Sequence, residues 1–405
     1  MSTLSTSIGA TLAAPPGDVD LVCLSHLRWN FVFQRPQHLL SRAARERRVF
    51  FFEEPVFGSE IPRLDTARDD SGVVVAVPHL PDGLSHDHVT HELRGLLDGL
   101  LTVESIDRFV LWYYAPMAWS FSHHLDPAVT VFDCMDELSA FAGAPQGLRD
   151  AERAVMAAAD VMFTGGHSLY EAKKHLHGNV HAFPSSVDVE HFARARREAA
   201  DPADQAGIPH PRLGFFGVLD ERFDIPLVRD VAAARPEWQI VLLGPVVKID
   251  PATLPRAANI HYLGPKTYAQ LPDYIAGWDV ALLPFARNES TRFISPTKTP
   301  EYLAAGRPVV STSIRDVVRP YEELGLARIA DTPDAFIEAV EAALAEPASR
   351  RLPVADAFLA RQSWDLTWRQ MSRAIARAYD RRLARETTTE VKADLTGLDP
   401  ASATA

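Results

Sequence analysis

The sequence contains two successive runs of short apolar segments that alternate with amphipathic segments of helical period. A helix that joins two strands of one sheet carries the chain back across it, so the joined strands are parallel. We therefore predict an α/β protein with two Rossmann-like, doubly wound domains that face a cleft. The expected strands are Val19–Ser25, Val49–Phe52, Val73–Val77, Arg108–Tyr114, Thr130–Phe132, Val161–Thr164 and His181–Pro184 in the first run, and Leu213–Gly217, Gln239–Leu243, Ile260–Leu263, Val280–Pro284, Pro308–Val310 and Ala327–Ile329 in the second.

A chain of 405 residues is long enough for two such domains. The segment between the two runs is rich in charge, Ala and Pro, which is typical of a linker, and we expect Phe192 to pack near the hinge. Both termini are rich in Ser, Thr and Ala, which favours disorder. The predicted boundaries are a disordered N-terminus at 1–17, a first domain at 18–190, a linker at 191–210, a second domain at 211–363, a long amphipathic helix at 364–385 and a disordered tail at 386–405.

The composition is that of an ordinary globular protein, with 47% hydrophobic and 23% charged residues and a net charge of −12. This charge argues against nucleic acid as a partner and against general adhesion to anionic lipid. No run of about 18 apolar residues predicts a transmembrane helix, and the N-terminus does not resemble a signal peptide. Cys23 and Cys134 lie in apolar strands, as buried reduced thiols do. We expect a cytoplasmic protein with at most peripheral membrane association.

The stretch from Phe293 to Ser311 is the most informative segment of the second run. It is predicted to form a loop, a short helix, a turn at Gly306 and a buried strand. Ser295 could cap the helix with Pro296 as its first residue, or Thr299 could cap it with Pro300 first. Either start directs free backbone N–H groups toward one spot, where an anion can bind.

This segment, S-P-x-K-x-x-E-Y-L-A-A-G-x-P-V-V, resembles the donor-binding segment of GT-B glycosyltransferases in the broad group around family 4. The resemblance implies that Lys298 meets the diphosphate of a nucleotide-sugar and that Glu301 holds its ribose, with Ser295 and Thr297 beside them. Many family-4 enzymes carry a second Glu eight residues before the first, at the sugar. Phe293 stands at that position here, so the resemblance supports a donor site and leaves the retaining chemistry of family 4 unsupported.

Further donor-binding candidates follow other predicted strands of the second domain. Gly217 ends the first strand, where a glycine lets the backbone approach a diphosphate closely. Arg222, flanked by acidic residues, and Lys248 follow the ends of two strands and carry charge that suits a phosphate, although Lys248 could equally be a solvated surface residue. Lys266 follows Gly264, and in similar enzymes the residues after this glycine line the base pocket; the alternative is that Gly264 only forms a turn.

The first domain offers a loop without glycine, HLRWNFVFQRPQH, directly after its first strand. Aromatic faces suit sugars and arginine suits phosphate, so we expect His26, Arg28, Trp29 and Arg35 to bind an acceptor. The turn Gly165–Ser168 follows another strand, and its N–H groups could line the cleft.

Two carboxylates lie beyond the strand Thr130–Phe132. In inverting GT-B enzymes an acid of the first domain deprotonates the acceptor hydroxyl, and a carboxylate can do so when burial or a like charge raises its pKa. Asp136 is the first candidate for this catalytic role and Asp133 the second. The structural alternative for Asp133 is a helix cap or an ion pair with an arginine.

The resemblance implies GT-B architecture with a C-terminal helix that crosses back onto the first domain, which would bind the acceptor while the second binds the donor. The segments QRPQHLL and DCMDELS look like bacterial glycosyltransferases of cell-surface polysaccharide synthesis, including teichuronic acid glycosyltransferases. The implied activity is a hexosyltransferase-type transfer from a nucleotide diphosphate-sugar to a sugar, lipid-linked sugar or polysaccharide, without a cofactor or metal. No G-x-G-x-x-G, P-loop or G-x-S-x-G motif favours another enzyme class. A nucleotide-sugar epimerase and a non-catalytic partner subunit on the same fold remain the alternatives.

Overall fold

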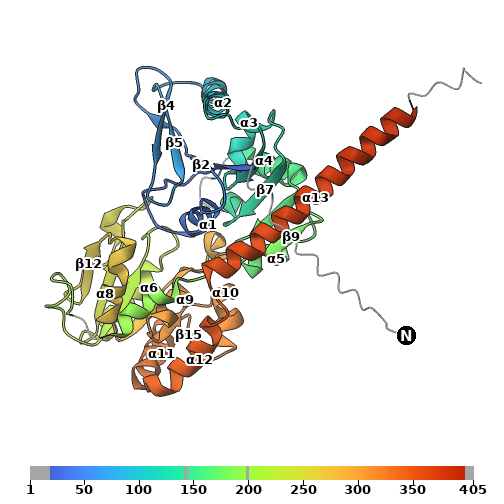
Figure 1. Cartoon of the computed structure of the whole chain (residues 1–405). Coiled ribbons are helices and arrows are strands. Elements are labelled where there is room, and N and C mark those ends of the chain that lie inside the picture. The colour runs from blue at the N-terminus through green and yellow to red at the C-terminus, as the bar shows by residue number, and fades with distance from the viewer. Residues whose placement is uncertain (1–18, 141–143, 145, 198–199, 397–405) are drawn as a thin grey trace, which may run out of the picture.

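The computed structural model describes residues 19–140, 144, 146–197 and 200–396. Two lobes, each built on its own sheet, lie against one another (Figure 1). The predicted disordered N-terminus at 1–17 lies outside the described residues. The predicted disordered tail at 386–405 is wrong for its first part, because α13 (Trp364–Thr396) remains helical past residue 385.

The first lobe contains a nine-stranded sheet in the order β3-β5-β2-β1-β6-β7-β8-β9, and β4 pairs with β5. All these pairs are parallel except β4 with β5. The strands are β1 (Asp20–Leu24), β2 (Val49–Phe52), β3 (Val56–Phe57), β4 (Arg63–Arg68), β5 (Val74–Leu80), β6 (Phe109–Tyr113), β7 (Val129–Cys134), β8 (Val161–Thr164) and β9 (Val180–Ala182). The helices of this part are α1 (Arg35–Ala43), α2 (His86–Val103), α3 (Trp119–Ser122), α4 (Gln146–Ala158) and α5 (His167–Lys173). The next helix, α6 (Val189–Ala193), packs against α8 and α9 of the second lobe.

The second lobe contains a six-stranded, fully parallel sheet in the order β12-β11-β10-β13-β14-β15. This is the 3-2-1-4-5-6 order of a doubly wound sheet, whose ligand crevice opens between β10 and β13. The strands are β10 (Arg212–Phe216), β11 (Gln239–Leu243), β12 (Ile260–Gly264), β13 (Val280–Leu283), β14 (Val309–Ser311) and β15 (Ala327–Ile329). The helices are α7 (Ile225–Ala234), α8 (Leu271–Ala276), α9 (Lys298–Ala304), α10 (Arg315–Val317), α11 (Pro333–Ala345) and α12 (Ala348–Leu359).

Apolar burial on both faces of the first sheet explains its layered structure. One face packs against α1 and α13, and the other packs against α2, α3 and α4. Strands that are buried on both faces are apolar throughout, as in the VFFF sequence of β2. The sequence prediction omitted β4 and α2: five of the six residues of β4 are exposed, so it lacks an apolar signal.

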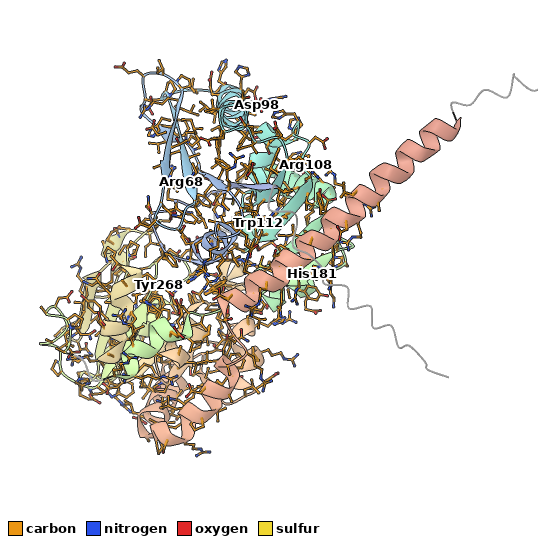
Figure 2. All side chains as sticks on the ribbon, viewed as in Figure 1. Arg68, Asp98, Arg108, Trp112, His181 and Tyr268 are labelled. Carbon is orange, nitrogen blue, oxygen red and sulfur yellow. The ribbon has the colours of Figure 1, made fainter. Side chains whose placement is uncertain are left out.

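The crossing helix α13 was predicted, and the structure confirms it. Trp364 and Trp368 are buried in the core of the first lobe, although they follow the whole second lobe in the chain. Trp368 lies over Trp112 of β6, with ring centroids 6.4 Å apart, and Trp364 stacks on His38 of α1 at 4.5 Å. Figure 2 labels Trp112 in the first lobe beside α13, and Figure 1 shows this helix crossing the first lobe and continuing beyond it. Phe192, which was expected near the hinge, is fully buried in the core of the second lobe.

Candidate active site

A cleft of about 880 Å³ lies between the lobes. Nearly all the segments that line it follow the carboxyl end of a strand, as the doubly wound topology predicts. The lining includes Trp29–Arg35 after β1, Met135 and Asp136 after β7, Phe215–Val218 across the end of β10, Leu243–Pro245 across the end of β11, Pro265–Ala269 after β12, and Ile294–Lys298 with Glu301 around the start of α9.

The start of α9 corrects both predicted helix starts. The helix begins at Lys298, and Thr297 is its N-cap, without a hydrogen bond from the cap side chain. Ser295 and Thr297 are half-buried and line the cleft, as expected for the donor segment. Tyr302 accepts a hydrogen bond at its hydroxyl from the backbone N–H of Phe216, 3.1 Å away. This bond fixes α9 against the end of β10.

Lys298 extends from the start of α9 across the end of β10. Its Nζ lies 5.8 Å from the ring centre of Phe215 and 5.7 Å from that of Phe216. Within the described residues it has no salt bridge or hydrogen bond. Burial lowers the pKa of this ammonium. The charge of Glu301 opposes that shift, and the charge of Arg222 adds to it. A poorly solvated cation without a carboxylate ligand is suited to bind an anion.

Glu301 lies one turn further along α9 and is 6% exposed. Its Oε2 has no hydrogen-bond partner, and neither has Oγ1 of the neighbouring Thr299, so two buried polar atoms are unsatisfied at one helix start. Burial raises the pKa of Glu301 to about 8, although the charge of Lys298 lowers it in part. Together, Lys298 and Glu301 place an ammonium and a carboxyl group in the cleft. Their contacts to a diphosphate and a ribose stay predictions.

Gly217 lies directly against the end of the Lys298 side chain. A Cβ atom there would lie 2.4 Å from Cε and 2.9 Å from Nζ of this lysine, and the backbone has φ +145°. Gly244 follows β11 with φ +136°, and its Cβ would lie 1.9 Å from the carbonyl oxygen of Gly217. The two glycines thus allow the loops after β10 and β11 to approach each other beneath the lysine.

The remaining basic candidates of the second lobe differ in position. Arg222 is half-buried, lines the cleft and donates to Asp220 from Nε and Nη2, so its charge is largely balanced. Lys266 also lines the cleft, but its Nζ lies 2.7 Å from Asp204. Lys248 does not line the cleft.

The structure corrects the expected roles of Asp133 and Arg35. Asp133 is fully buried and accepts two hydrogen bonds from the guanidinium of Arg35, each 2.9 Å long. The same guanidinium donates to the carbonyl oxygen of Phe183 at 2.7 Å. A fully buried carboxylate bound to arginine cannot reach an acceptor hydroxyl, so the ion-pair alternative holds for Asp133. Arg35 borders the cleft with a guanidinium that serves this internal pair.

Arg28 and Trp29 also differ from the expectation. The guanidinium of Arg28 donates to Glu53 and to the carbonyl oxygens of Glu54 and Pro55, away from the cleft. Trp29 borders the cleft but is only 6% exposed, and its indole N–H donates to Asp69 at 2.7 Å. These two side chains hold the loop after β1 in place.

Asp136 and His26 remain near the cleft. Asp136 is half-buried and lines both the main cleft and a small pocket that also contains His26. Nδ1 of His26 is buried without a hydrogen-bond partner, and burial lowers the pKa of this imidazole, while the charge of Asp136 opposes that shift. Asp136 lines the cleft from the first lobe and Arg222 from the second. Burial lowers the pKa of Arg222, but its bonds to Asp220, and to a smaller degree the charge of Asp136, raise it overall.

Sequence reasoning missed the exposed aromatic residues of the cleft. Phe31 and Phe33, in the same loop as Trp29, are 59% and 44% exposed and line the cleft. Phe33 stacks on Tyr268 of the other lobe with ring centroids 4.6 Å apart. Figure 2 labels Tyr268 in the part of the second lobe that faces the first. The letters FVF contained the signal, but they did not reveal which aromatic residues turn outward.

The turn Gly165–Ser168 does not present its N–H groups to the cleft as predicted. Asp316 of the second lobe accepts hydrogen bonds from the N–H groups of His167 and Ser168, each 2.9 Å long. A Cβ at Gly166 would collide with Asp316 and with Ser295. The turn is therefore a contact between the lobes.

Phe293 occupies the place where a second acidic residue was sought. Its side chain is half-buried and packs against the core of the first lobe, with the guanidinium of Arg292 5.1 Å from its ring centre. It does not line the cleft. The residue thus joins the lobes.

Comparisons with known proteins agree with this architecture. Residues 210–346 match the family described as "Glycosyl transferases group 1". A Bacillus subtilis (strain 168) protein named as a teichuronic acid biosynthesis glycosyltransferase, TuaH, is 26% identical over 308 residues, which cover 72% of this chain and 73% of the relative.

Solved structures match nearly the whole chain at low identity and so define its fold. A sucrose-phosphate synthase from Thermosynechococcus elongatus has a TM-score of 0.67 at 14% identity and covers 92% of this chain and 100% of its own. An E. coli protein solved with UDP-2-fluoro glucose has a TM-score of 0.63 at 12% identity, with coverages of 90% and 98%. WaaG, a glycosyltransferase involved in lipopolysaccharide biosynthesis, has a TM-score of 0.60 at 13% identity, with coverages of 88% and 99%.

Proposed function

We propose that this chain, a GT-B glycosyltransferase of the family-4-like group, transfers a hexose from a nucleotide diphosphate-sugar to a hydroxyl acceptor in the synthesis of a cell-surface polysaccharide or glycoconjugate. The observation that carries the proposal is the pair Lys298 and Glu301, which lies unsatisfied at the start of α9 inside the cleft between the lobes. The names of TuaH and WaaG support the polysaccharide setting. The UDP-2-fluoro glucose in the E. coli structure supports a sugar nucleotide as the donor.

Transfer breaks the bond between the anomeric carbon and the diphosphate oxygen and forms a bond from that carbon to the acceptor oxygen. Negative charge accumulates on the departing diphosphate, next to Nζ of Lys298. A fixed cation in a poorly solvated site stabilises such charge more strongly than water does. We propose that Lys298 and backbone N–H groups at the start of α9 provide this stabilisation without a metal ion.

The acceptor loses a proton as its oxygen attacks, and we propose Asp136 as the base. It is the carboxylate of the first lobe that borders the cleft beyond β7, once Asp133 is assigned to its ion pair. Phe31 and Phe33 present exposed faces on the same side, and a sugar ring can pack on such faces. Glu301, on the opposite lobe, would accept hydrogen bonds from the ribose hydroxyls.

We further propose that the protein acts in the cytoplasm on a sugar, lipid-linked sugar or polysaccharide. Cys23 and Cys134 are buried free thiols, as is usual in a reducing compartment. Among the described residues, no helix combines the length and apolarity that crossing a membrane requires.

The experiment is a screen of UDP-, GDP- and ADP-sugars with mixed acceptors, which measures release of the nucleoside diphosphate and formation of a glycoside. We expect one donor class to turn over, and only when an acceptor is present. Asp136→Asn should lower kcat about a hundredfold while the donor KM changes little. Turnover of the donor alone into a stereoisomer would instead indicate the epimerase, and absence of turnover with every donor would favour the non-catalytic partner subunit.

A further inference from the structure

A row of arginines runs along the exposed side of α13. Arg369, Arg373, Arg377 and Arg381 follow each other at intervals of four residues, and each is exposed. Residues four apart lie on one side of a helix, so the four guanidinium groups form a ridge of about 18 Å along the axis. Arg385 continues the spacing.

This ridge lies opposite the packed face of the helix. The buried face carries Trp364, Trp368, Met371, Ile375 and Tyr379, which bind α13 to the core of the first lobe. The arginines of the ridge contribute nothing to that core. Packing therefore does not explain why one long cation recurs at each exposed turn, where any polar residue would suffice.

The ridge is also electrostatically unbalanced. Within the described part of the chain, none of its four arginines has a salt bridge or hydrogen bond. Other arginines near α13 differ: Arg42 is paired with Asp365, and Arg382 with Asp126 and Asp160. From Trp364 to Arg385 the helix contains six arginines and two aspartates, whereas the whole chain has a net charge of −12. Such segregation of charge indicates an anionic partner at this face.

The ridge is exposed along its length and lies next to the edge of the first sheet. Its neighbour is β9, the edge strand of the first sheet, where the imidazole of His181 is within electrostatic range of Arg377 and Arg381. Figure 2 shows His181 and Arg108 on either side of α13. A straight ridge of single charges on a convex helix fits a flat anionic surface better than a nucleic acid duplex, which is recognised by elements that enter its grooves.

The ridge also has a defined position relative to the cleft. It begins one turn after Asp365, which binds Arg42 of α1. The loop that lines the cleft, Trp29–Gln34, leads directly into α1. The ridge therefore starts near the junction of the lobes, where α13 begins (Figure 1), on the side of the first lobe that also carries the cleft loop.

We propose that the arginine ridge of α13, formed by Arg369, Arg373, Arg377 and Arg381, docks the protein on the surface of an anionic lipid membrane. The interaction is electrostatic and peripheral. The net charge still argues against binding of anionic lipid by the rest of the surface, and the ridge is the exception. It does not depend on the proposed sugar transfer, although a lipid-linked acceptor would then be presented beside the cleft.

The test is sedimentation of the full chain with vesicles at physiological ionic strength. Wild-type protein should bind vesicles of equal parts phosphatidylcholine and phosphatidylglycerol, and should not bind vesicles of phosphatidylcholine alone. The triple variant R369Q/R373Q/R377Q should bind the anionic vesicles roughly a hundredfold more weakly, because each arginine near such a surface adds about fivefold to the partition coefficient. Because these side chains have no partners in the fold, the variant should unfold at the same temperature as the wild type.

The matched control is R229Q/R256Q/R350Q, which removes three exposed arginines of the second lobe and should bind vesicles like the wild type. Equal loss in both triple variants, equal binding to neutral vesicles, or no binding by the wild type would overturn the proposal. A DNA duplex that displaces the protein from vesicles at equal charge concentration would also overturn it. If the triple variant does not fold, R373Q alone should weaken binding about fivefold. Sugar transfer to a soluble acceptor should be unchanged in either variant, which separates this proposal from the proposed function.

Discussion

The two lobes differ in whether the main charged residues beside the cleft form ion pairs. In the first lobe, Arg35 and Asp133 neutralise each other in a fully buried pair, and Arg28 is bound to Glu53. In the second lobe, Lys298 and Glu301 lie in the cleft without a salt bridge. Burial lowers the pKa of Lys298 and raises that of Glu301, which favours the neutral form of each group. The ion pairs of the first lobe stabilise a loop. The buried groups of the second lobe are unfavourable in the free protein, and a bound ligand can stabilise them.

This difference shows how charged residues that only stabilise the fold can be distinguished from charged residues that bind a ligand. The sequence favoured Asp133, near the end of β7, and Glu301, in the first turn of α9, equally well. The distinction is whether the polar atoms are satisfied: Asp133 accepts two hydrogen bonds at 2.9 Å, whereas Oε2 of Glu301 accepts none in the described structure. A buried group that is left unsatisfied costs free energy and persists where function requires it.

The largest expected effect breaks the scaffold. Asp133→Ala should lower the free energy of unfolding by about 3–5 kcal/mol, because it leaves the guanidinium of Arg35 buried without its counterion. Chemical denaturation measures this. Asp65→Ala removes an exposed partner of Arg63 and is the matched control, expected to cost less than about 1 kcal/mol.

The same measurement on the second lobe sharpens the contrast. Lys298→Met removes a poorly solvated cation that has no carboxylate ligand, so the free energy of unfolding should stay unchanged or rise. A loss as large as that of Asp133→Ala would show that Lys298 belongs to the scaffold, and the comparison between the lobes would fail.

The next largest effect is expected on nucleotide binding when the space next to Lys298 is filled. Gly217→Ala places a Cβ 2.4 Å from Cε of the lysine and should weaken binding of a nucleoside diphosphate roughly ten- to hundredfold, since the lysine must move. Equilibrium dialysis with labelled nucleotide measures it. Gly207→Ala, at a position with open space around the new methyl group, is the control and should bind normally.

The pH dependence of stability tests the burial of Glu301. Its pKa is about 8 in the folded protein against an ordinary value of 4.5, so between these values the folded state retains a proton that the unfolded chain has lost. The free energy of unfolding should therefore fall as pH rises from about 4.5 to 8, by up to about 1.4 kcal/mol per pH unit. Glu301→Gln should lack this fall. Parallel denaturation curves for both proteins from pH 5 to pH 8 would show that Glu301 is ionised in the free protein.

The smallest effect is expected at Lys266, which also lines the cleft. Its ammonium is held by Asp204 at 2.7 Å and lies 4.9 Å from the ring centre of Tyr274. Lys266→Ala should therefore weaken nucleotide binding less than about threefold. A larger loss in the same dialysis assay would mean that a paired lysine can still serve the ligand.

The periodicity of the sequence predicted most of the fold because buried parallel strands are uniformly apolar. Val161–Thr164 and Gln239–Leu243 were predicted with their observed bounds. The antiparallel strand Arg63–Arg68 was missed because its residues are mostly solvated and its pairing depends on a distant partner. The continuation of α13 to Thr396 was missed because a tail rich in Thr and Glu shows no apolar periodicity.

The site could be predicted only where its geometry is local. Lys298 and Glu301 lie on one short helix, so their spacing in sequence determines their proximity. Arg35 and Asp133 are 98 residues apart, and nothing near either residue reveals that they neutralise each other. Phe293 illustrates the same limit: its contact with the first lobe depends on how the lobes pack.

The most direct test of the account is calorimetric titration of the wild-type protein and Lys298→Ala with the nucleoside diphosphate of the donor that turns over. We expect measurable binding by the wild type and a Kd at least about a hundredfold higher for the variant, because a desolvated lysine–phosphate contact is lost. Equal Kd values for the two proteins would contradict the assignment of this cleft to a sugar nucleotide held by Lys298.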